Sequence, residues 1–205
     1  MFTLRTENLA KRFGPRKVFS GINFEITTGQ SLAVVGHNGS GKSTLLKVLL
    51  AQLRPTKGKV EFARDNGPMD DAAIRDQVSF VAPYLTLYDH LTAEENLKFF
   101  ATVAGDSITG KQVDSLLARV GLEGRGLDDV VGYSSGMKQR LKYAVAMLKK
   151  PAFLILDEPT SNLDQEGKEI VFNLIDEYRK ESIIIIATNE TEEYQLAEQI
   201  CRLGQ

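Results

Sequence analysis

One short segment of the sequence has the residue types and the spacing to bind phosphate groups. It spans residues 36–44 and reads Gly36-His37-Asn38-Gly39-Ser40-Gly41-Lys42-Ser43-Thr44. Its glycines let backbone amides close around phosphate oxygens, and a helix that begins at its end adds partial positive charge. We expect Lys42 to reach the β- and γ-phosphates of a nucleotide and Ser43 to be a ligand of Mg²⁺. The alternative, an ordinary glycine-rich turn, is disfavoured because every fixed position of the motif is filled.

Two adjacent acidic residues, Asp157 and Glu158, follow the apolar run 153–156. Ligands bind at the carboxyl ends of strands in parallel α/β sheets, so this position predicts a metal and water site. We expect Asp157 to hold Mg²⁺ through water and Glu158 to polarise the attacking water. A solvated strand end is the alternative, and the phosphate-binding segment disfavours it because such a segment requires an acidic partner.

A third segment, residues 133–140, opens a helix and reads Tyr133-Ser134-Ser135-Gly136-Met137-Lys138-Gln139-Arg140. Ser134 is a good N-cap, and Ser135 and Gly136 leave the first helical amides open. This pattern predicts a second anion site, separate from the first. Taken alone, however, a purely structural helix cap explains the segment better.

The elements that must position these segments alternate between strands and helices. The expected strands are 4–9, 23–26, 31–35, 59–62, 78–81, 153–156 and 183–187. The expected helices are 42–53, 92–104, 109–120, 135–149, 165–179 and 192–199, and residues 65–71 read as a polar turn. This order predicts an α/β fold with a mostly parallel sheet and a helical insertion from about residue 84 to 148.

Composition narrows the class of protein. The chain has 205 residues, of which 42% are hydrophobic and 25% charged, so we expect one globular domain. The net charge of −2 removes the simplest support for nucleic-acid binding. A single cysteine, Cys201, excludes an internal disulfide and fits a reducing compartment. Because no apolar run approaches the ~18 residues of a membrane span and no signal peptide is evident, we expect a cytoplasmic chain.

Over essentially its whole length the chain resembles an ATP-binding-cassette (ABC) ATPase. Residues 36–44 resemble the Walker A motif and residues 153–158 the Walker B motif. Residues 133–137 are similar to the signature Leu-Ser-Gly-Gly-Gln, with the serine and second glycine kept as Ser134 and Gly136 but Ser135 and Met137 in place of the first glycine and the glutamine. Residues 159–164 resemble the D-loop. Phe13 lies where the family has an aromatic residue that stacks on adenine.

The resemblance implies a fold, a cofactor and partners. It implies one domain over 1–205, with a phosphate-loop (RecA-like) core at about 1–83 and 149–205, an N-terminal antiparallel β part and a helical subdomain at about 84–148. It implies a head-to-tail homodimer around two MgATP, in which Walker A of one copy faces Ser134, Ser135, Gly136 and Met137 of the other. It also implies a separate multi-span membrane permease, which would hold the chain at the inner face of the membrane.

Two family positions depart from the usual pattern. The glutamine that usually follows the strand before the insertion is replaced by Pro83 or Tyr84, and the histidine that usually follows the last strand is Asn189. Asparagine donates a hydrogen bond but does not accept a proton, so we expect slow hydrolysis with intact ATP binding. We interpret His37 and His90 as surface residues, because His37 holds a variable loop position and His90 lies in the insertion.

The leading hypothesis is the ATP-hydrolysing subunit of an ABC transporter, with Lys42, Glu158 and Asn189 in catalysis. Residues 83–90 then either receive the membrane partner or are buried in the insertion. The alternatives are a soluble ABC ATPase outside transport and a weakly hydrolysing cassette that acts mainly as an ATP-binding switch. A small-molecule kinase leaves the signature without a role, and a GTPase would need an Asn-Lys-x-Asp run that the sequence lacks.

Overall fold

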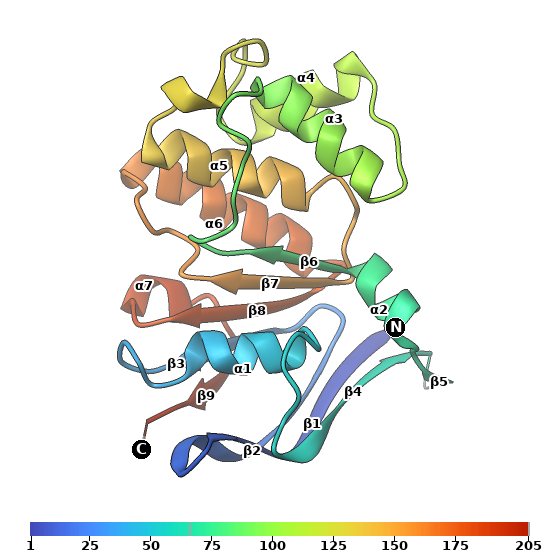
Figure 1. Ribbon diagram of the computed structural model, residues 1–205, viewed down its shortest axis with the longest axis vertical. Helices are drawn as coiled ribbons and strands as arrows, with labels where there is room; N and C mark the ends of the chain where they lie inside the picture. The colour runs from blue at the N-terminus through green and yellow to red at the C-terminus, as the bar shows by residue number, and fades with distance from the viewer. Residues whose placement is uncertain (66, 205) are drawn as a thin grey trace.

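Two β-sheets organise the chain in the computed structural model, which describes residues 1–65 and 67–204 (Figure 1). The antiparallel sheet has the order β2-β1-β4-β5, with β1 (Phe2–Phe13), β2 (Arg16–Thr27), β4 (Lys57–Arg64) and β5 (Gly67–Pro68). The parallel sheet has the order β6-β7-β8-β3-β9, with β3 (Ser31–Val35), β6 (Val78–Val81), β7 (Phe153–Asp157), β8 (Ile183–Thr188) and β9 (Gln199–Arg202). The predicted α/β fold, with a parallel sheet and an N-terminal antiparallel part, is confirmed.

The central strands of the parallel sheet are apolar because both faces are covered. Every residue of β3, β7 and β8 is buried. Successive side chains of a strand point to opposite faces, and each face belongs to a different core. Phe153 and Ile155 pack in the core on the α1 side, whereas Leu154 and Leu156 pack in the core on the α5 side. Packing on both faces therefore fixes the register of the strands.

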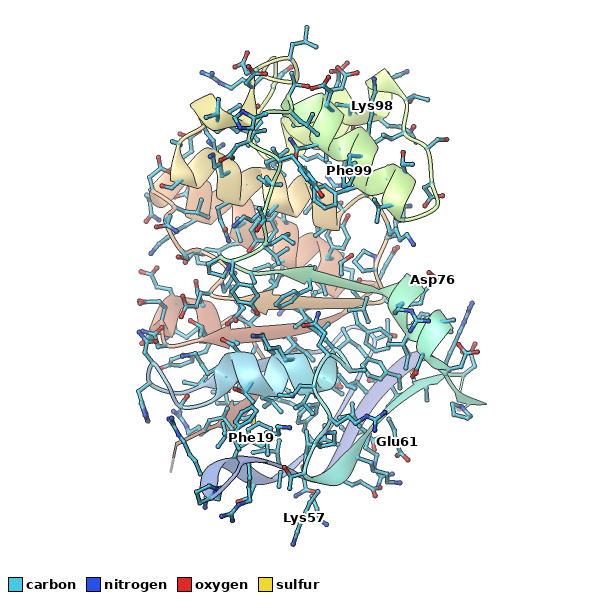
Figure 2. The ribbon with its side chains drawn as sticks, viewed as in Figure 1. Phe19, Lys57, Glu61, Asp76, Lys98 and Phe99 are labelled. Carbon is cyan, nitrogen blue, oxygen red and sulfur yellow. The ribbon has the colours of Figure 1, made fainter. Side chains whose placement is uncertain are left out.

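Helix α1 (Lys42–Leu49) lies between the two sheets (Figure 1). Its Leu45, Leu46 and Leu49 are fully buried among residues of β1, β2 and β7. Phe19 of β2 completes this core and appears beneath α1 in Figure 2. The helix stops after Leu49 because Ala51 adopts a left-handed backbone with φ 55°. Packing against the antiparallel sheet thus fixes the helix that follows the phosphate-binding segment.

The other face of the parallel sheet carries the remaining long helices. They are α3 (Ala93–Val103), α4 (Gly110–Arg119), α5 (Ser135–Ala146) and α6 (Gln165–Arg179). α6 and α5 cover the sheet, and α3 and α4 lie beyond α5 (Figure 1). Thr92 and Thr109 each form a capping box with the residue three positions later, which sets where α3 and α4 begin. Within residues 1–65 and 67–204, none of the helices combines the length and apolar character needed to cross a membrane.

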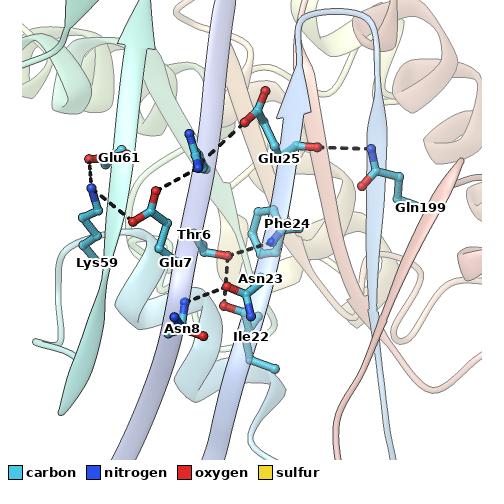
Figure 3. A network of polar contacts seen from close by, with 11 residues as sticks. Thr6, Glu7, Asn8, Ile22, Asn23, Phe24, Glu25, Lys59, Glu61 and Gln199 are labelled. Carbon is cyan, nitrogen blue, oxygen red and sulfur yellow. Dashed lines mark hydrogen bonds and ion pairs between the residues drawn. The ribbon is translucent and has the colours of Figure 1, made fainter.

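The outer face of the antiparallel sheet is polar (Figure 3). Lys59 on β4 pairs with Glu7 at 3.2 Å and with Glu61 at 2.6 Å, and Arg5 connects Glu7 to Glu25 on β2. The same pairing with Glu61 and Glu7 raises the pKa of Lys59. Because these side chains are exposed, such pairs contribute little to stability, so the sheet depends on its buried face.

Several predicted element boundaries were wrong. The helix predicted over 42–53 ends at Leu49, and the one predicted over 135–149 ends at Ala146. The last predicted helix, 192–199, is the short α7 (Thr191–Tyr194), and β9 follows because it pairs with the edge of β3. Residues 65–71 contain β5, and α2 (Asp71–Gln77) was not predicted. The helices over 92–104, 109–120 and 165–179 are confirmed to within a residue at each end.

Candidate active site

Three loops leave the same edge of the parallel sheet because β8 pairs in parallel with both β3 and β7. Val35 lies opposite Thr188, and Asp157 lies opposite Ala187. The backbone N–H of Glu158 donates to the Ala187 carbonyl at 2.9 Å, which carries the ladder one residue further. Residues 36–41, the segment from Glu158 and the segment from Asn189 therefore begin side by side. The predicted meeting of these groups is a consequence of strand register.

The segment 36–41 curls around the ammonium group of Lys42. Lys42 Nζ donates to the Gly36 carbonyl at 2.8 Å, and the Ser40 N–H donates to the His37 carbonyl at 3.0 Å. The Lys42 residue is only 6% exposed. A positive charge held this deeply, in a loop of backbone amides, has the chemistry of an anion site. His37 and Asn38 are exposed on the outside of the loop, as predicted for His37; His90 is likewise exposed.

Gly41 is the N-cap of α1 and shows why this position needs glycine. Its φ is +104°, and a Cβ there would lie 2.5 Å from Cγ1 of Val18. The first turn of α1 then reads Lys-Ser-Thr-Leu, so its open amides lie beside positive rather than negative charge. Unpaired amides, the helix dipole and Lys42 all favour a bound anion at this end of α1.

A cavity of about 460 Å³ adjoins this loop. Among the described residues, its lining is Phe13, Arg16, Val18, Asn38, Gly39, Gly41, Lys42, Ser43, Thr44 and Glu158. Phe13 is half exposed, with the ammonium of Lys11 5.0 Å from its ring centre. Arg16 pairs with Phe13 across the β1–β2 hairpin and was missed by the sequence analysis. The Gly14-Pro15 turn could have indicated this pairing, because it lies between the two residues in the sequence.

Asp157 is buried at the end of β7, with 2% of its surface exposed. Burial raises the pKa of its carboxyl, and the charge of Glu158 raises it further, while the Ser43 hydroxyl and Lys42 lower it. A hydroxyl beside one carboxylate is a donor set that fits Mg²⁺, which keeps several waters and takes its other ligands from phosphate oxygens. The residues present therefore fit the metal that the resemblance implies.

Glu158 lies between two cavities. It has a positive φ of 48°, which is uncommon for a residue with a side chain, and it lines the 460 Å³ cavity beside the phosphate-binding loop. It also lines a second cavity of about 300 Å³ together with Thr188 and Asn189. The structure thus brings Glu158 and Asn189 to one cavity, and Lys42 is not among the described residues that line it.

The N-terminus of α5 lies outside the first cavity. Ser134 caps α5 by accepting a 3.2 Å hydrogen bond from the Met137 N–H, and both Ser134 and Ser135 are exposed. A Cβ on Gly136 would lie 3.1 Å from the Asn162 carbonyl, so glycine permits the close approach of the 159–164 loop. Residues 133–137 are not among the described residues that line the cavity at Lys42. This chain therefore does not bring its own α5 N-terminus to its own phosphate-binding loop.

Either Pro83 or Tyr84 stands where the family has its glutamine, and of the two it is Tyr84 whose side chain packs on α1. Its ring centre lies 5.3 Å from the ammonium of Lys47, and burial together with the charge of Asp157 raises the pKa of its hydroxyl. The carbonyls of Ala82 and Pro83 instead accept hydrogen bonds from Lys142 of α5, whose pKa burial lowers. This lysine was also missed, because residues 60 positions apart give no local signal. Over residues 83–90 the exposure is mixed: Tyr84 and Tyr88 are exposed and Leu87 is buried.

A parallel sheet with a phosphate-binding loop after one strand and an acidic pair after another defines the phosphate-loop class of α/β proteins. Residues 19–161 match the family model described as ABC transporter. This match covers more than half of the chain, so the chain belongs to the ABC transporter family.

Individual relatives agree with this family. The chain is 34% identical to the uncharacterized ABC transporter ATP-binding protein YxlF of Bacillus subtilis, over 97% of this chain and 65% of YxlF. It is 32% identical to the lantibiotic transport ATP-binding protein SrtF of Streptococcus pyogenes, over 91% of this chain and 79% of SrtF. A solved dimeric ATP-binding cassette in a post-hydrolysis state, bound to ADP and phosphate, superposes with a TM-score of 0.83 at 25% identity, covering 98% of this chain and 94% of that one. The chain thus spans about two thirds of YxlF and four fifths of SrtF.

We predict that Asp157→Asn stabilises the protein without nucleotide while weakening MgATP binding. The raised pKa means that the folded state binds the Asp157 proton more tightly than the unfolded state does. The carboxyl therefore stabilises the fold at low pH and loses that contribution as pH rises through its folded pKa. At pH 7 the variant should unfold at higher urea than the wild type, and the difference should shrink towards pH 4.

Urea titrations at several pH values, with and without MgATP, measure both effects. Asp76→Asn is the control, because that side chain is 71% exposed and its loss should change little. A variant less stable than the wild type at pH 7 would contradict the burial argument.

Proposed function

We propose that the chain is the ATP-binding and ATP-hydrolysing subunit of an ABC transporter. The observation that carries the proposal is the convergence of Lys42, Asp157, Glu158 and Asn189 at one edge of the parallel sheet, through the pairing of β8 with β3 and β7. The family membership and the names of the relatives support the same function.

In the proposed bound state, the backbone amides of residues 36–43 and the ammonium of Lys42 surround the β- and γ-phosphates. Lys42 exchanges its internal bond to the Gly36 carbonyl for phosphate oxygens, so the loop exists before the nucleotide arrives. Phe13 stacks on the adenine, and Arg16 lies beside it at the rim of the same cavity. Mg²⁺ held by Ser43 and Asp157 would neutralise charge on the phosphate oxygens.

Hydrolysis then requires a water aligned with the γ-phosphate. Glu158 accepts a hydrogen bond from that water and orients it, since it lines the cavity at Lys42 and lies at the end of the strand next to β8. The amide of Asn189, which lines the second cavity together with Glu158, donates a hydrogen bond to the γ-phosphate without the charge that an imidazolium would supply. We therefore infer slow turnover. The substitution at Asn189 is also the observation that favours the second candidate function, an ATP-binding switch with weak hydrolysis.

A second copy of the chain completes the proposed site. The α5 N-terminus is capped by Ser134, exposes Ser135 and lies outside the cavity at Lys42 of the same chain. An anion supplied from another copy satisfies its open amides. The superposed cassette structure is dimeric, which supports this arrangement.

A multi-span membrane permease is the further proposed partner, and it would hold the chain at the inner face of the membrane. The relatives named for transport support this partner. Tyr84, near Lys47 of α1, and Tyr88, packed on Phe99 of α3, are exposed aromatic side chains that suit a protein contact. We further propose that the chain divides into a core at about 1–83 and 149–205 and a helical subdomain at about 84–148.

We predict that Lys42→Ala weakens MgATP binding at least a hundredfold. A charge-assisted contact to the γ-phosphate is lost, and backbone amides alone match that charge poorly. Calorimetric titration of the purified chain with MgATP measures the affinity, and the melting midpoint without nucleotide shows whether the variant folds. Lys98→Ala, a half-exposed lysine of α3, is the control and should bind as the wild type does. Equal affinity in wild type and Lys42→Ala would remove the phosphate-loop assignment.

We predict that Asn189→His raises kcat for ATP hydrolysis about tenfold or more and leaves KM within about threefold. The imidazole supplies a charge-assisted hydrogen bond, which is roughly twice as strong as a neutral one. Steady-state phosphate release by both proteins tests this. A wild type that already turns over rapidly and gains nothing from histidine would show that Asn189 is a sufficient replacement.

A further inference from the structure

Glu193 is a buried carboxylate that binds the loop after the catalytic acidic pair. It lies on α7, four residues beyond Asn189, and only 2% of its surface is exposed. Its Oε1 accepts a 2.9 Å hydrogen bond from the Thr160 N–H and a second, short one from the Thr160 hydroxyl. Thr160 is itself 5% exposed and lies two residues beyond Glu158. The two segments that flank the water site are therefore joined by one side chain.

Only one of the two carboxylate oxygens of Glu193 takes part in this contact. Oε2 of Glu193 is also buried, and among the described residues it has no hydrogen-bond partner. A buried carboxylate with an unpaired oxygen is unfavourable, because it loses hydration without full replacement. The contact to Thr160 itself needs only one acceptor oxygen, which an amide side chain also supplies.

The same short loop is held from its other side by α5. The carbonyl of Pro159 accepts a 2.9 Å hydrogen bond from the Tyr143 hydroxyl and a 3.4 Å one from Gln139 Nε2. Tyr143 is fully buried, and burial followed by the charge of Glu193 raises the pKa of its hydroxyl. Residues 159 and 160 are thus fixed between the helix that begins at Ser135 and the helix that follows Asn189.

We propose that Glu193 is a positioning residue, which fixes the loop after Glu158 relative to Asn189 and to α5. The proposal rests on the proposed ATP hydrolysis at this site. Glu158, Thr160, Asn189 and Glu193 line one cavity of about 300 Å³, so a shift of Thr160 changes the setting of both Glu158 and Asn189. Glu158 has a positive φ, which is unfavourable for a residue with a side chain. Its backbone conformation therefore depends on the contacts that hold residues 159 and 160.

This role separates turnover from nucleotide binding. ATP affinity depends on Lys42 and the first turn of α1, which lie across the sheet edge on the β3 side. Loss of the Glu193 contact lets the 159–162 loop move, and a misplacement of about 1 Å can cost roughly a hundredfold in rate. Glu193→Ala should therefore lower kcat about 10- to 100-fold with KM for ATP changed less than about threefold.

The test compares four variants with the wild type in steady-state phosphate release, calorimetric MgATP binding and thermal unfolding. Glu193→Ala removes both hydrogen bonds, and Glu193→Gln keeps an acceptor for Thr160 and should retain turnover within about threefold. Thr160→Val removes the hydroxyl half of the contact and should lower kcat about three- to tenfold. Glu192→Ala is the matched control, because its exposed carboxylate lies on the same turn and pairs only with Lys168 among the ion pairs of the described residues.

Each of the possible results either supports or overturns the inference. Low kcat with normal KM in Glu193→Ala, together with recovery in Glu193→Gln, supports the inference. Should Glu193→Ala fail to fold, Thr160→Val decides alone: reduced kcat at normal ATP affinity supports it, and wild-type turnover overturns it. Wild-type turnover in a folded Glu193→Ala overturns the inference and leaves the proposed function intact. A wild type that neither binds nor hydrolyses ATP overturns both.

Discussion

The parallel pairing of β8 with β3 on one side and β7 on the other is the interaction on which the site depends. It aligns Val35, Asp157 and Thr188 at one edge of the sheet. Three loops from distant parts of the chain therefore begin at the ends of neighbouring strands. The alignment holds because every residue of these strands is buried and alternate side chains enter two different cores. A slip by one residue would exchange the two sets of side chains, which the packing on both faces opposes.

Burial of the charged side chains at this edge lowers the stability of the fold. Lys42 and Asp157 are both buried, and Lys42 is satisfied by the carbonyl of Gly36 while Asp157 carries a raised pKa. A site arranged in this way is less stable alone than with a phosphate group and metal bound, because the ligand supplies the missing partners. The same reasoning applies to the α5 N-terminus, whose exposed Ser135 lies apart from the cavity of its own chain.

Much of the fold and the main motifs could be predicted from the sequence, because they rest on local signals. Helix 165–179 begins after the N-cap Asp164 and was predicted at both ends, and the buried strands 153–157 and 183–188 were visible as short apolar runs. β9 was not predicted, since its pairing with β3 is a contact across the fold, and α2 was missed because it buries none of its residues. The links from Glu193 to Thr160 and from Lys142 to Pro83 join residues 33 and 59 positions apart. The spacing of apolar residues along the sequence does not indicate such contacts.

The central claim is that this chain supplies half of a composite ATP site and that a second copy supplies the other half. The direct measurement is the molar mass of Glu158→Gln by light scattering, with and without MgATP. This change should stop hydrolysis and leave binding in place, because binding rests on Lys42, Ser43 and the α1 N-terminus. The account predicts a monomer without nucleotide and a dimer with MgATP, and it predicts that Ser135→Arg in the same background abolishes the dimer. A Glu158→Gln protein that binds MgATP and stays monomeric at high protein concentration would contradict it.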